Sequence, residues 1–431
     1  MKANQGIALA TLLTFWGLIS TPLSPAQADM GKHVVNVLGP WSGGERKDFQ
    51  DVVTPWENET DYTMAFVSTR DLNAVLTTRL EVGDPPEVTI LPNPGFMREL
   101  AERGKLVALD TILDMKRIQS DYARTWLDLG RYRGNLYAIF YKATSKGTVW
   151  YSPRNFKAKG YSVPKTWEEA IALSHKIVSE GGTPWVIGAE SGAATGWPLT
   201  DWIEIILLNR FGPEMYDQWV SHEIPWTAPG IRRSFETLGR IVHTPKYVYG
   251  GPAGVLATNF IYGSYVPYTT PPGAYMNYLG GFAQGFIQKQ YPNLRPGEDY
   301  AFFPFPTIEP RYAGGVTGGA DLIVLTKDTP GARSLVRYLS TARAQEIWVK
   351  KGAFIASNRN VKPDTYPDVI AREMALQLAN AKVFRFDGSD LMPAKVNDVF
   401  WKATLEYVNN PANLDKVLQS IEKVAAEAYG K

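Results

Sequence analysis

The chain has 431 residues and an almost balanced charge, with 45 Lys and Arg against 43 Asp and Glu. This balance predicts no basic surface for nucleic acid or anionic lipid. The absence of cysteine excludes disulfides, a thiol nucleophile, a Cys-ligated metal and the acylated cysteine of a bacterial lipoprotein.

The first 28 residues have the pattern of a secretory signal peptide. Lys2 gives a basic start, residues 7–19 are almost entirely apolar, and Ala26-Gln27-Ala28 offers small residues to a processing enzyme. The apolar run is too short for a permanent membrane span, and a buried N-terminal helix is the alternative interpretation. We expect a mature protein that starts at Asp29 and is free in the periplasm, with no lipid anchor.

Strands and helices alternate at the start of the mature chain. Short apolar runs predict strands, and apolar residues at helical spacing predict the helices between them. In chain order these elements are strand 34–38, helix 49–56, strand 62–67, helix 72–80 and strand 87–91. The alternation predicts parallel strands, which bind ligands at their carboxyl ends. Those ends are residues 39–44, 68–71 and 92–95.

A second region begins near Trp150. Thr166 and Glu169 form a capping box that opens a helix. Residues 181–312 are rich in Gly, Pro and aromatic residues, and they include predicted helices at 202–210 and 231–241 and an extended stretch at 301–306.

The later part of the chain is expected to return to the first domain. The returning part contains a predicted strand at 322–326, which follows a glycine-rich turn, and a helix opened by Thr329-Pro330. The remaining helices end with one that has an apolar face over 414–425. The chain is therefore expected to cross between two lobes near 145–150, 303–314 and 355–365, which would make a hinge of separate strands. The predicted N-terminal lobe is 29–147 plus 313–357, and the predicted C-terminal lobe is 148–312 plus 358–431.

Motifs for catalysis are missing from the sequence. The four histidines include no pair at helical spacing, and no nucleophile elbow, phosphate loop or dinucleotide fingerprint occurs. Asp387 and Asp390 are a close carboxylate pair of the kind that glycosidases use, but glycosidase chemistry needs a defined separation that the sequence does not supply. We expect no enzymatic activity, no cofactor and no metal.

Five segments carry a resemblance to a known family. They are Pro40-Trp41-Ser42-Gly43-Gly44-Glu45, Gly83-Asp84-Pro85-Pro86-Glu87-Val88, Val163-Pro164-Lys165-Thr166-Trp167-Glu168-Glu169, Gly318-Gly319-Ala320-Asp321 and Phe384-Arg385-Phe386-Asp387-Gly388-Ser389-Asp390-Leu391-Met392-Pro393. With these segments the chain resembles the extracellular sugar-binding proteins of ABC importers, in the branch that binds α-glucosides. It departs from many relatives in lacking the lipoprotein cysteine.

The resemblance implies an α/β, two-lobed periplasmic-binding-protein fold of type II, similar to cluster D, with a multi-strand hinge and a ligand cleft between the lobes. It implies a small neutral glycoside as ligand, such as sucrose, trehalose or glucosylglycerol. The implied partners are the membrane permease subunits of an importer with a cytoplasmic ATPase. We expect a monomer that binds no nucleic acid.

Fifteen residues are candidate ligand contacts. They are Trp41, Ser42, Glu45, Asp84, Asn93, Lys142, Trp197, Asp201, Tyr262, Gly318, Gly319, Asp321, Arg385, Asp387 and Asp390. The aromatic residues offer stacking faces, the glycines allow close backbone approach, and charged groups make the stronger hydrogen bonds to hydroxyls.

Nine of these candidates have an alternative role. Trp41 would otherwise belong to the core, Glu45 and Asp201 would cap helices, and Lys142 would be solvated. Asp84 and Asp321 would satisfy turns. Arg385, Asp387 and Asp390 would form an interlobe ion pair.

Two other functions stay open on the sequence alone. One is a secreted glycosidase or lyase acting on similar sugars, which depends on carboxylate pairs such as Asp387 and Asp390. The other is a binding protein for a non-sugar solute such as a peptide or polyamine, which a mainly acidic cleft would favour.

Overall fold

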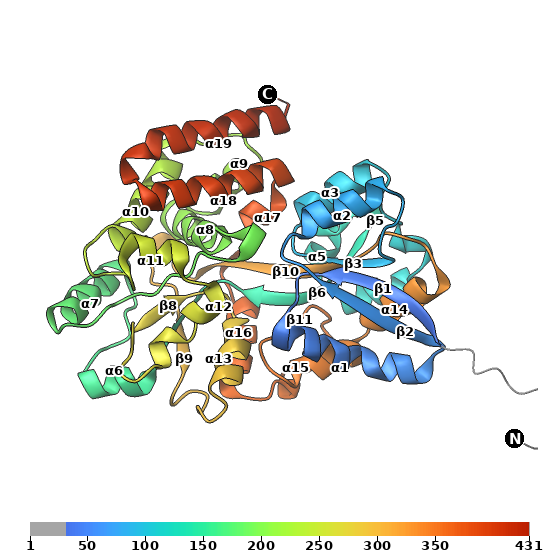
Figure 1. The fold of residues 1–431 in the computed structure, drawn as a ribbon, viewed down its shortest axis with the longest axis horizontal. Helices are drawn as coiled ribbons and strands as arrows, with labels where there is room; N and C mark the ends of the chain where they lie inside the picture. Colours follow the sequence, from blue (N-terminus) through green and yellow to red (C-terminus); the bar gives the residue numbers. More distant parts are fainter. Residues whose placement is uncertain (1–31, 431) are drawn as a thin grey trace, which may run out of the picture. The chain divides into compact units, whose positions relative to one another are not determined.

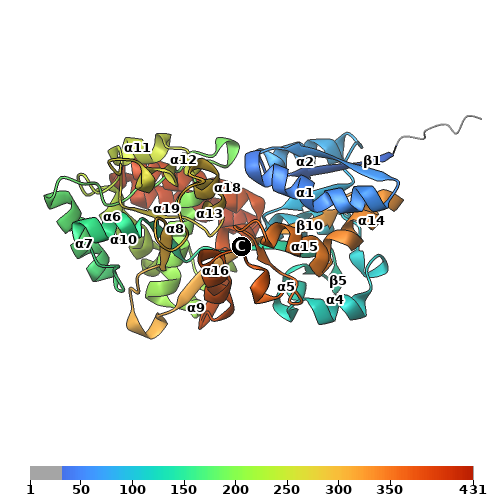
Figure 2. The ribbon, with the colours of Figure 1, turned by 90° about the horizontal axis from the view of Figure 1, so that it is seen from below.

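The computed structural model describes residues 32–430. The predicted signal peptide, residues 1–28, lies outside the described residues. Residues 33–430 form one compact unit, in which two α/β lobes stand side by side (Figures 1 and 2).

The larger sheet has seven strands in the described part of the chain, in the order β11-β6-β10-β3-β1-β2, with β12 beside β10. Its strands are β1 (His33–Gly39), β2 (Tyr62–Ser68), β3 (Val88–Leu91), β6 (Ala138–Ser145), β10 (Gly315–Leu325), β11 (Ile355–Ala356) and β12 (Val383–Phe386). As predicted, β1 runs parallel to both β2 and β3. The returning strand β10 runs antiparallel to β3 and β6.

Helices cover this sheet because their apolar stripes face it. The helices of this lobe are α1 (Gly43–Glu59), α2 (Leu72–Glu81), α3 (Pro94–Glu102), α4 (Met115–Asp121), α5 (Arg124–Leu129), α14 (Pro330–Leu339) and α15 (Ala342–Val349). The predicted helical stripe of α1, Phe49, Val52, Val53 and Trp56, is buried as expected. Burial of such side chains stabilises the fold by about 1.5–3 kcal/mol each.

The returning strand β10 begins earlier than predicted. The sequence indicated a glycine-rich turn before 322–326, but the strand starts at Gly315. Gly318 is needed there for packing, because a Cβ on it would lie 2.6 Å from the Phe384 ring and 2.9 Å from the Thr144 carbonyl oxygen. The glycines therefore allow close strand packing and do not form a turn.

The second lobe has a three-stranded sheet in the order β8-β7-β9, formed by β8 (Met276–Tyr278), β7 (Thr148–Tyr151) and β9 (Ala301–Pro304). Its helices are α6 (Pro153–Lys159), α7 (Trp167–Ser179), α8 (Trp197–Phe211), α9 (Pro213–Val220), α10 (Pro229–Val242), α11 (Gly251–Ala257), α12 (Phe260–Gly263), α13 (Ala283–Gln290), α17 (Gly388–Leu391), α18 (Ala394–Asn409) and α19 (Leu414–Ala428). The core of this lobe is rich in buried rings, among them Trp185, Trp202 and Trp226.

The chain passes directly from the larger sheet to the smaller one, since only Lys146 and Gly147 separate β6 from β7. It returns between β9 and β10. Before α16 (Val369–Ala379), Val361 and Tyr366 still pack with the core of the first lobe, as does Ala371 within that helix.

Candidate ligand-binding site

A pocket of about 910 Å³, including the part that is open to solvent, lies where the two lobes meet. Three consecutive parallel strands end at one of its walls. Pro40 and Trp41 follow β1, Arg70 follows β2, and Pro92 and Asn93 follow β3, and all of them line the pocket. The strand-end argument from sequence therefore located this wall, as expected for an α/β sheet.

The antiparallel pair β6 and β10 supplies the next wall. Lys142, Thr144 and Lys146 alternate along β6 and its extension, so that all three side chains face the pocket. Asp321 of β10 is the register partner of Lys142, and a bulge follows it. The Oδ2 atom of Asp321 accepts a hydrogen bond of 2.7 Å from the Trp41 indole nitrogen, and Lys142 forms an ion pair with Glu45.

The second lobe presents one face of α8. Trp197, Asp201 and Glu204 stand at positions i, i+4 and i+7, which lie on one side of a helix. The Trp197 ring is held edge-to-face by Phe260 and Phe282, with centroids 5.2 and 5.8 Å away, and its indole nitrogen donates to Ser191 Oγ at 3.1 Å. A partly buried ring fixed on several sides is a rigid stacking platform.

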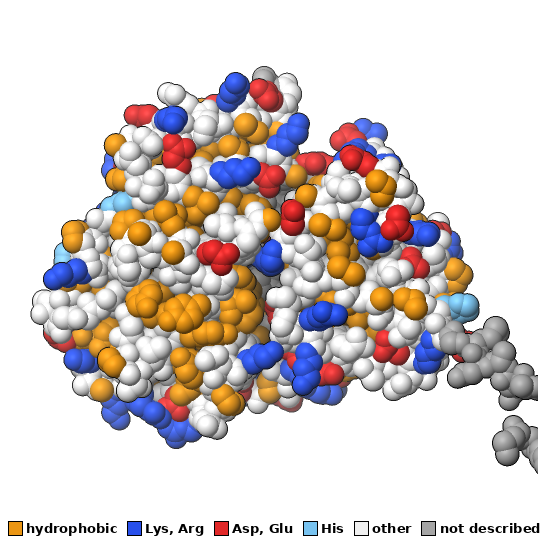
Figure 3. Space-filling model, viewed as in Figure 1, with side chains coloured by type: hydrophobic (Ala, Val, Ile, Leu, Met, Phe, Trp, Pro, Cys, Tyr) orange, Lys and Arg blue, Asp and Glu red, His pale blue; other side chains and the backbone are white. Residues whose placement is uncertain are grey.

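More rings line the pocket beside Trp197. Phe260, Phe282, Phe286 and Trp401 all contribute to its lining. Figure 3 shows hydrophobic side chains gathered on the second lobe over α12 and α13, next to the crevice between the lobes. The pocket therefore combines an aromatic side with a polar side.

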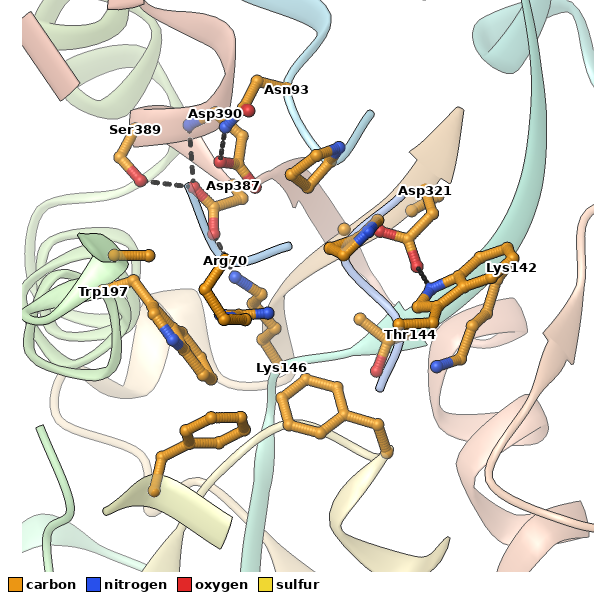
Figure 4. A pocket seen from close by; sticks show the side chains of 18 of the residues that line it. Arg70, Asn93, Lys142, Thr144, Lys146, Trp197, Asp321, Asp387, Ser389 and Asp390 are labelled. Carbon is orange, nitrogen blue, oxygen red and sulfur yellow. Dashed lines mark hydrogen bonds and ion pairs between the residues drawn. The ribbon is translucent and has the colours of Figure 1, made fainter. Parts of the chain in front are cut away.

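The polar side is centred on the buried ammonium of Lys146. Its Nζ lies 2.8 Å from Asp201 Oδ1 and forms a second ion pair with Asp387 Oδ2 (Figure 4). Asp387 Oδ1 also accepts from Ser389 Oγ at 2.8 Å and from the backbone of Asp390 at 3.0 Å. Lys146 lies 5.5 Å from the centroid of the Trp197 ring, so it links the polar and the aromatic sides.

Two further carboxyl groups complete this cluster. Asp390 accepts a hydrogen bond of 2.5 Å from the Asn93 side chain, which joins the two lobes. Glu204 accepts from the backbone nitrogens of Gly388 and Ser389 at 2.7 and 3.1 Å, and so fixes the start of the short helix α17.

Burial in this cluster changes which groups are charged. Burial raises the pKa of Asp201 to about 8, against the opposing effect of Lys146. Burial and the charge of Asp387 raise the pKa of Asp390 well above its usual range. Burial would also raise the pKa of Asp387, but Lys146, Ser389 and the Asp390 backbone outweigh it and hold that pKa low. Lys146 and Asp387 are thus the charged pair of this cluster, whereas burial favours the neutral forms of Asp201, Asp390 and Glu204.

Nine of the fifteen candidate residues line the pocket. They are Trp41, Glu45, Asn93, Lys142, Trp197, Gly319, Asp321, Asp387 and Asp390. Trp41 is only 2% exposed, and its ring centroid lies 4.8 Å from those of Phe49 and Trp348. Most of its ring therefore belongs to the core.

The other six candidates do not line this pocket. Asp201 lies just behind the wall, 3% exposed and paired with Lys146. Gly318 packs against β6 and Phe384, as described above. Ser42 is exposed at the start of α1, and Tyr262 is 49% exposed on the surface.

Asp84 and Arg385 are the two candidates held by ion pairs elsewhere. The Asp84 side chain is 77% exposed and pairs with Arg79 at 3.1 Å. Arg385, in β12, makes two hydrogen bonds of 2.6 and 2.7 Å to Asp217 on α9 of the second lobe. Neither side chain is directed to the ligand pocket.

Sequence reasoning missed Arg70, Lys146 and Glu204. Arg70 stands in the strand-end segment 68–71 that was singled out as a whole. Lys146 follows Lys142 by four residues, which is the same face of a strand, and Glu204 follows Trp197 by seven, which is the same face of a helix. The periodicity of the neighbouring elements could have identified both.

A family model described as bacterial extracellular solute-binding protein matches residues 42–346, most of the chain. The chain belongs to this family. The matched segment of this solute-binding protein includes the ends of β2 and β3, strand β6, helix α8 and strand β10, which together form most of the pocket wall.

Two relatives are similar over nearly the whole solute-binding protein. The Osmoprotective compounds-binding protein GgtB of Synechocystis sp. is 35% identical over 396 residues, which cover 92% of this chain and 93% of the relative. The Alpha-glucosides-binding periplasmic protein AglE of Rhizobium meliloti is 35% identical over 398 residues, which cover 90% of this chain and 86% of the relative.

A solved structure shows the same fold. The "Chitin oligosaccharide binding protein" superposes with a TM-score of 0.82 at 18% identity, over 93% of this chain and all of the other. This likeness confirms the two-lobed fold expected from the sequence.

The structure describes residues 32–430 of this solute-binding protein. No helix there is both long and apolar enough to cross a membrane, and no group of three or more His, Cys, Asp or Glu residues is placed to hold a metal ion.

Proposed function

We propose that this protein is the periplasmic binding component of an ABC importer, and that it captures an α-glucoside or a related compatible solute such as glucosylglycerol, sucrose or trehalose. The observation that carries the proposal is the pocket with rings on one side and hydrogen-bonding carboxyl groups on the other. A sugar ring has an apolar face for stacking and hydroxyls at its edge for polar partners. The names of the two relatives at 35% identity support the ligand class.

The charge of the cluster favours a neutral ligand. Four carboxyl groups surround Lys146, but Asp387 is neutralised by its ion pair with Lys146, and burial favours the neutral forms of Asp201, Asp390 and Glu204. A protonated carboxyl can donate a hydrogen bond and an ionised one can accept, so the cluster can serve both ends of a hydroxyl. A polyamine would gain little attraction from such a site.

The same cluster supports binding without turnover. Asp387 is fully engaged by Lys146, Ser389 and the Asp390 backbone, and Asp390 is engaged by Asn93. We propose that these contacts position the two carboxyl groups to bind ligand hydroxyls, and that neither acts as nucleophile or general acid toward a glycosidic bond. We propose that the protein releases its ligand unchanged to the permease subunits of the importer.

The proposed lobes need one change from the sequence expectation. Because Val361, Tyr366 and Ala371 pack with the first-lobe core, and β12 pairs with β10 in the larger sheet, we place the third crossing between β12 and α17 and not at 355–365. We propose that the lobes close on the ligand and that the mature protein, cleaved before Asp29 and lacking a lipid anchor, acts as a monomer.

Calorimetry with sucrose, trehalose, maltose and glucosylglycerol, with spermidine as the cationic comparison, tests the function. We expect saturable heat with at least one neutral glycoside and none with spermidine. Prolonged incubation followed by product analysis should recover the glycoside intact. Binding of spermidine alone, or turnover that is lost in Asp387→Asn, would contradict the proposal.

A further inference from the structure

A second pocket opens directly beside the first and shares six lining residues with it, Pro40, Arg70, Pro92, Asn93, Ala194 and Trp401. Both lobes contribute to its remaining walls. The first lobe supplies the start of α2, and the second lobe supplies the residues around Ala193 and the middle of α18. Since both lobes form it, closure of the lobes would shape this second pocket together with the first.

The two pockets differ in chemistry. The first has five aromatic or indole rings besides Trp401, whereas the second has Trp401 alone among hydroxyl, amide and charged groups. Those polar residues are Thr69, Asp71, Asn73, Thr195, Asp398 and Lys402. Within residues 32–430, no hydrogen bond or ion pair occupies the side-chain amide of Asn73 or the carboxylate of Asp398, so both can serve a ligand.

The junction between the pockets also has spare donors. Arg70 donates to Ser191 Oγ at 2.8 Å, and its guanidinium lies 5.5 Å from the centroid of the Phe260 ring. A guanidinium has five N–H donors, and this bond uses one of them. The remaining donors lie where a ligand would pass from the aromatic pocket into the polar one.

A third pocket adjoins the first on the opposite side but is a poorer continuation. It shares Glu45, Lys142 and two phenylalanines with the first pocket, and the ion pair between Glu45 and Lys142 stands between them. Lys351 in that pocket is already paired with Asp48 and Asp51, at 3.5 and 2.6 Å. Opening this route would break a partly buried ion pair and leave the buried Lys142 ammonium without its partner, which is costly.

We propose that the second pocket is a subsite for the second, hydroxyl-rich unit of a two-unit ligand whose first ring occupies the aromatic pocket. Arg70 and Asn93 contact the ligand at the junction, and Asn73 and Asp398 contact the hydroxyls of the second unit. This inference rests on the proposed function and narrows it. The preferred ligand is an α-glucoside with a polar second unit, a second sugar or a glycerol, and single-ring glycosides bind more weakly.

Calorimetry of paired ligands tests the subsite. Methyl α-glucoside fills only the first pocket, and trehalose, sucrose or glucosylglycerol would fill both. The variants are Asn73→Ala, which removes a contact, and Ala74→Trp, which fills the second pocket from an exposed position on α2. Ala253→Trp, at an exposed position on α11 outside both pockets, is the matched control.

We expect Ala74→Trp to weaken the two-unit ligand by more than about tenfold and Asn73→Ala by about fivefold, as for the loss of one or two hydrogen bonds. Methyl α-glucoside should bind all variants within about twofold of the unaltered protein, and Ala253→Trp should change neither ligand. Equal losses for both ligands, or no loss for either, would overturn the subsite. If the unaltered protein binds no glycoside at all, the proposed function itself fails.

Discussion

Trp197 presents its ring to the pocket from the first position of α8, with Lys146 beneath it and two phenylalanines at its edges. The ring is thus preorganised, and a ligand face can stack on it without further ordering of the side chain. Trp41 shows the opposite case, because its ring is used mainly to pack the core beneath β1.

Trp197→Ala should therefore weaken binding of the ligand by more than tenfold. Stacking on an aromatic side chain contributes about 1–3 kcal/mol per ring, by analogy with nucleic-acid bases. Calorimetry with the best-bound glycoside measures the loss, and Tyr262→Ala, which removes an exposed ring outside the pocket, should leave the affinity unchanged. Equal effects of the two substitutions would contradict the assignment of Trp197.

Asp321 gives the site a pH-dependent group. Burial raises its pKa to about 6, although Lys142 and the Trp41 indole lower it. Of the other charged groups nearby, Glu45 raises this pKa and Arg70 lowers it. The folded protein therefore holds the proton of Asp321 between about pH 4 and 6, where the unfolded chain has lost it. In this window the contribution of Asp321 to stability falls as the pH rises.

The Asp321→Asn variant should therefore become more stable relative to the unaltered protein as the pH rises from about 4 to about 6, and the difference should then stay constant. The reason is that Asn mimics the protonated acid at every pH and can still accept the hydrogen bond from Trp41. Urea denaturation at each pH measures the difference. Asp328→Asn is the comparison variant, and its stability relative to the unaltered protein should change with pH in the opposite direction. The reason is that the hydrogen bond from Arg333 lowers the pKa of Asp328. A difference that is constant with pH would contradict the role of Asp321.

Among the site residues, those that follow strand ends could be predicted from the sequence, because a parallel sheet fixes where its strand ends meet. Trp41 and Asn93 are examples. The periodicity of β6 could have placed Lys146 on this wall, but its role could not be predicted, because that role depends on Asp201 and Asp387, which lie 55 and 241 residues away. Asp84 looked equally promising in sequence, and only its exposed pair with Arg79 shows that it faces solvent.

At the scale of elements, local signals predicted the ends of helices well. The Thr166 hydroxyl accepts from the Glu169 backbone at 3.2 Å, and the Glu169 carboxylate accepts from the backbones of Lys165 and Thr166. This is the capping box expected for α7. β10 was misjudged because its glycines suit a turn in isolation, and only the approach of β6 and Phe384 explains why they lie in a strand.

Thr166→Ala should cost about 1 kcal/mol of stability, the usual cost of losing an N-cap side chain. Thr166→Ser keeps the hydroxyl and should retain most of the stability. The midpoint of chemical denaturation measures both, and the slope of the transition should stay the same. If Ser and Ala are equally destabilising, the hydroxyl is not what stabilises the start of α7.

At the scale of the whole molecule, the two-lobed α/β architecture could be predicted from the order of elements, but the third crossing could not. The sequence of residues 358–379 does not indicate to which lobe they belong. Their position depends on the packing of Val361, Tyr366 and Ala371 against residues that are far away in the sequence. The buried cluster around Lys146 likewise depends on contacts between residues that are far apart in the sequence. It joins the segment after β6, helix α8 and the segment after β12.

Lys146→Met should destabilise the protein by about 3–5 kcal/mol, because it leaves buried carboxyl groups without their cation. Adding Asp387→Asn in the same chain should recover part of the loss. Urea denaturation measures these variants against Lys350→Met, which removes an exposed lysine that is 4.0 Å from Glu346. A loss no greater than that of Lys350→Met would show that the cluster does not stabilise the fold.

The course of β10 has a consequence for how the molecule moves. Residues 315–318 of this strand pair with β12, residues 318–324 pair with β6 and residues 322–325 pair with β3, so every residue of the strand has at least one neighbouring strand. If the lobes open and close about β6 and β10, the hinge is among the best-protected parts of the backbone. Deuterium should then enter Gly318 to Leu325 slowly in the free and the ligand-bound protein alike, while the segments at the pocket rim, such as 192–195, change their exchange rate on binding.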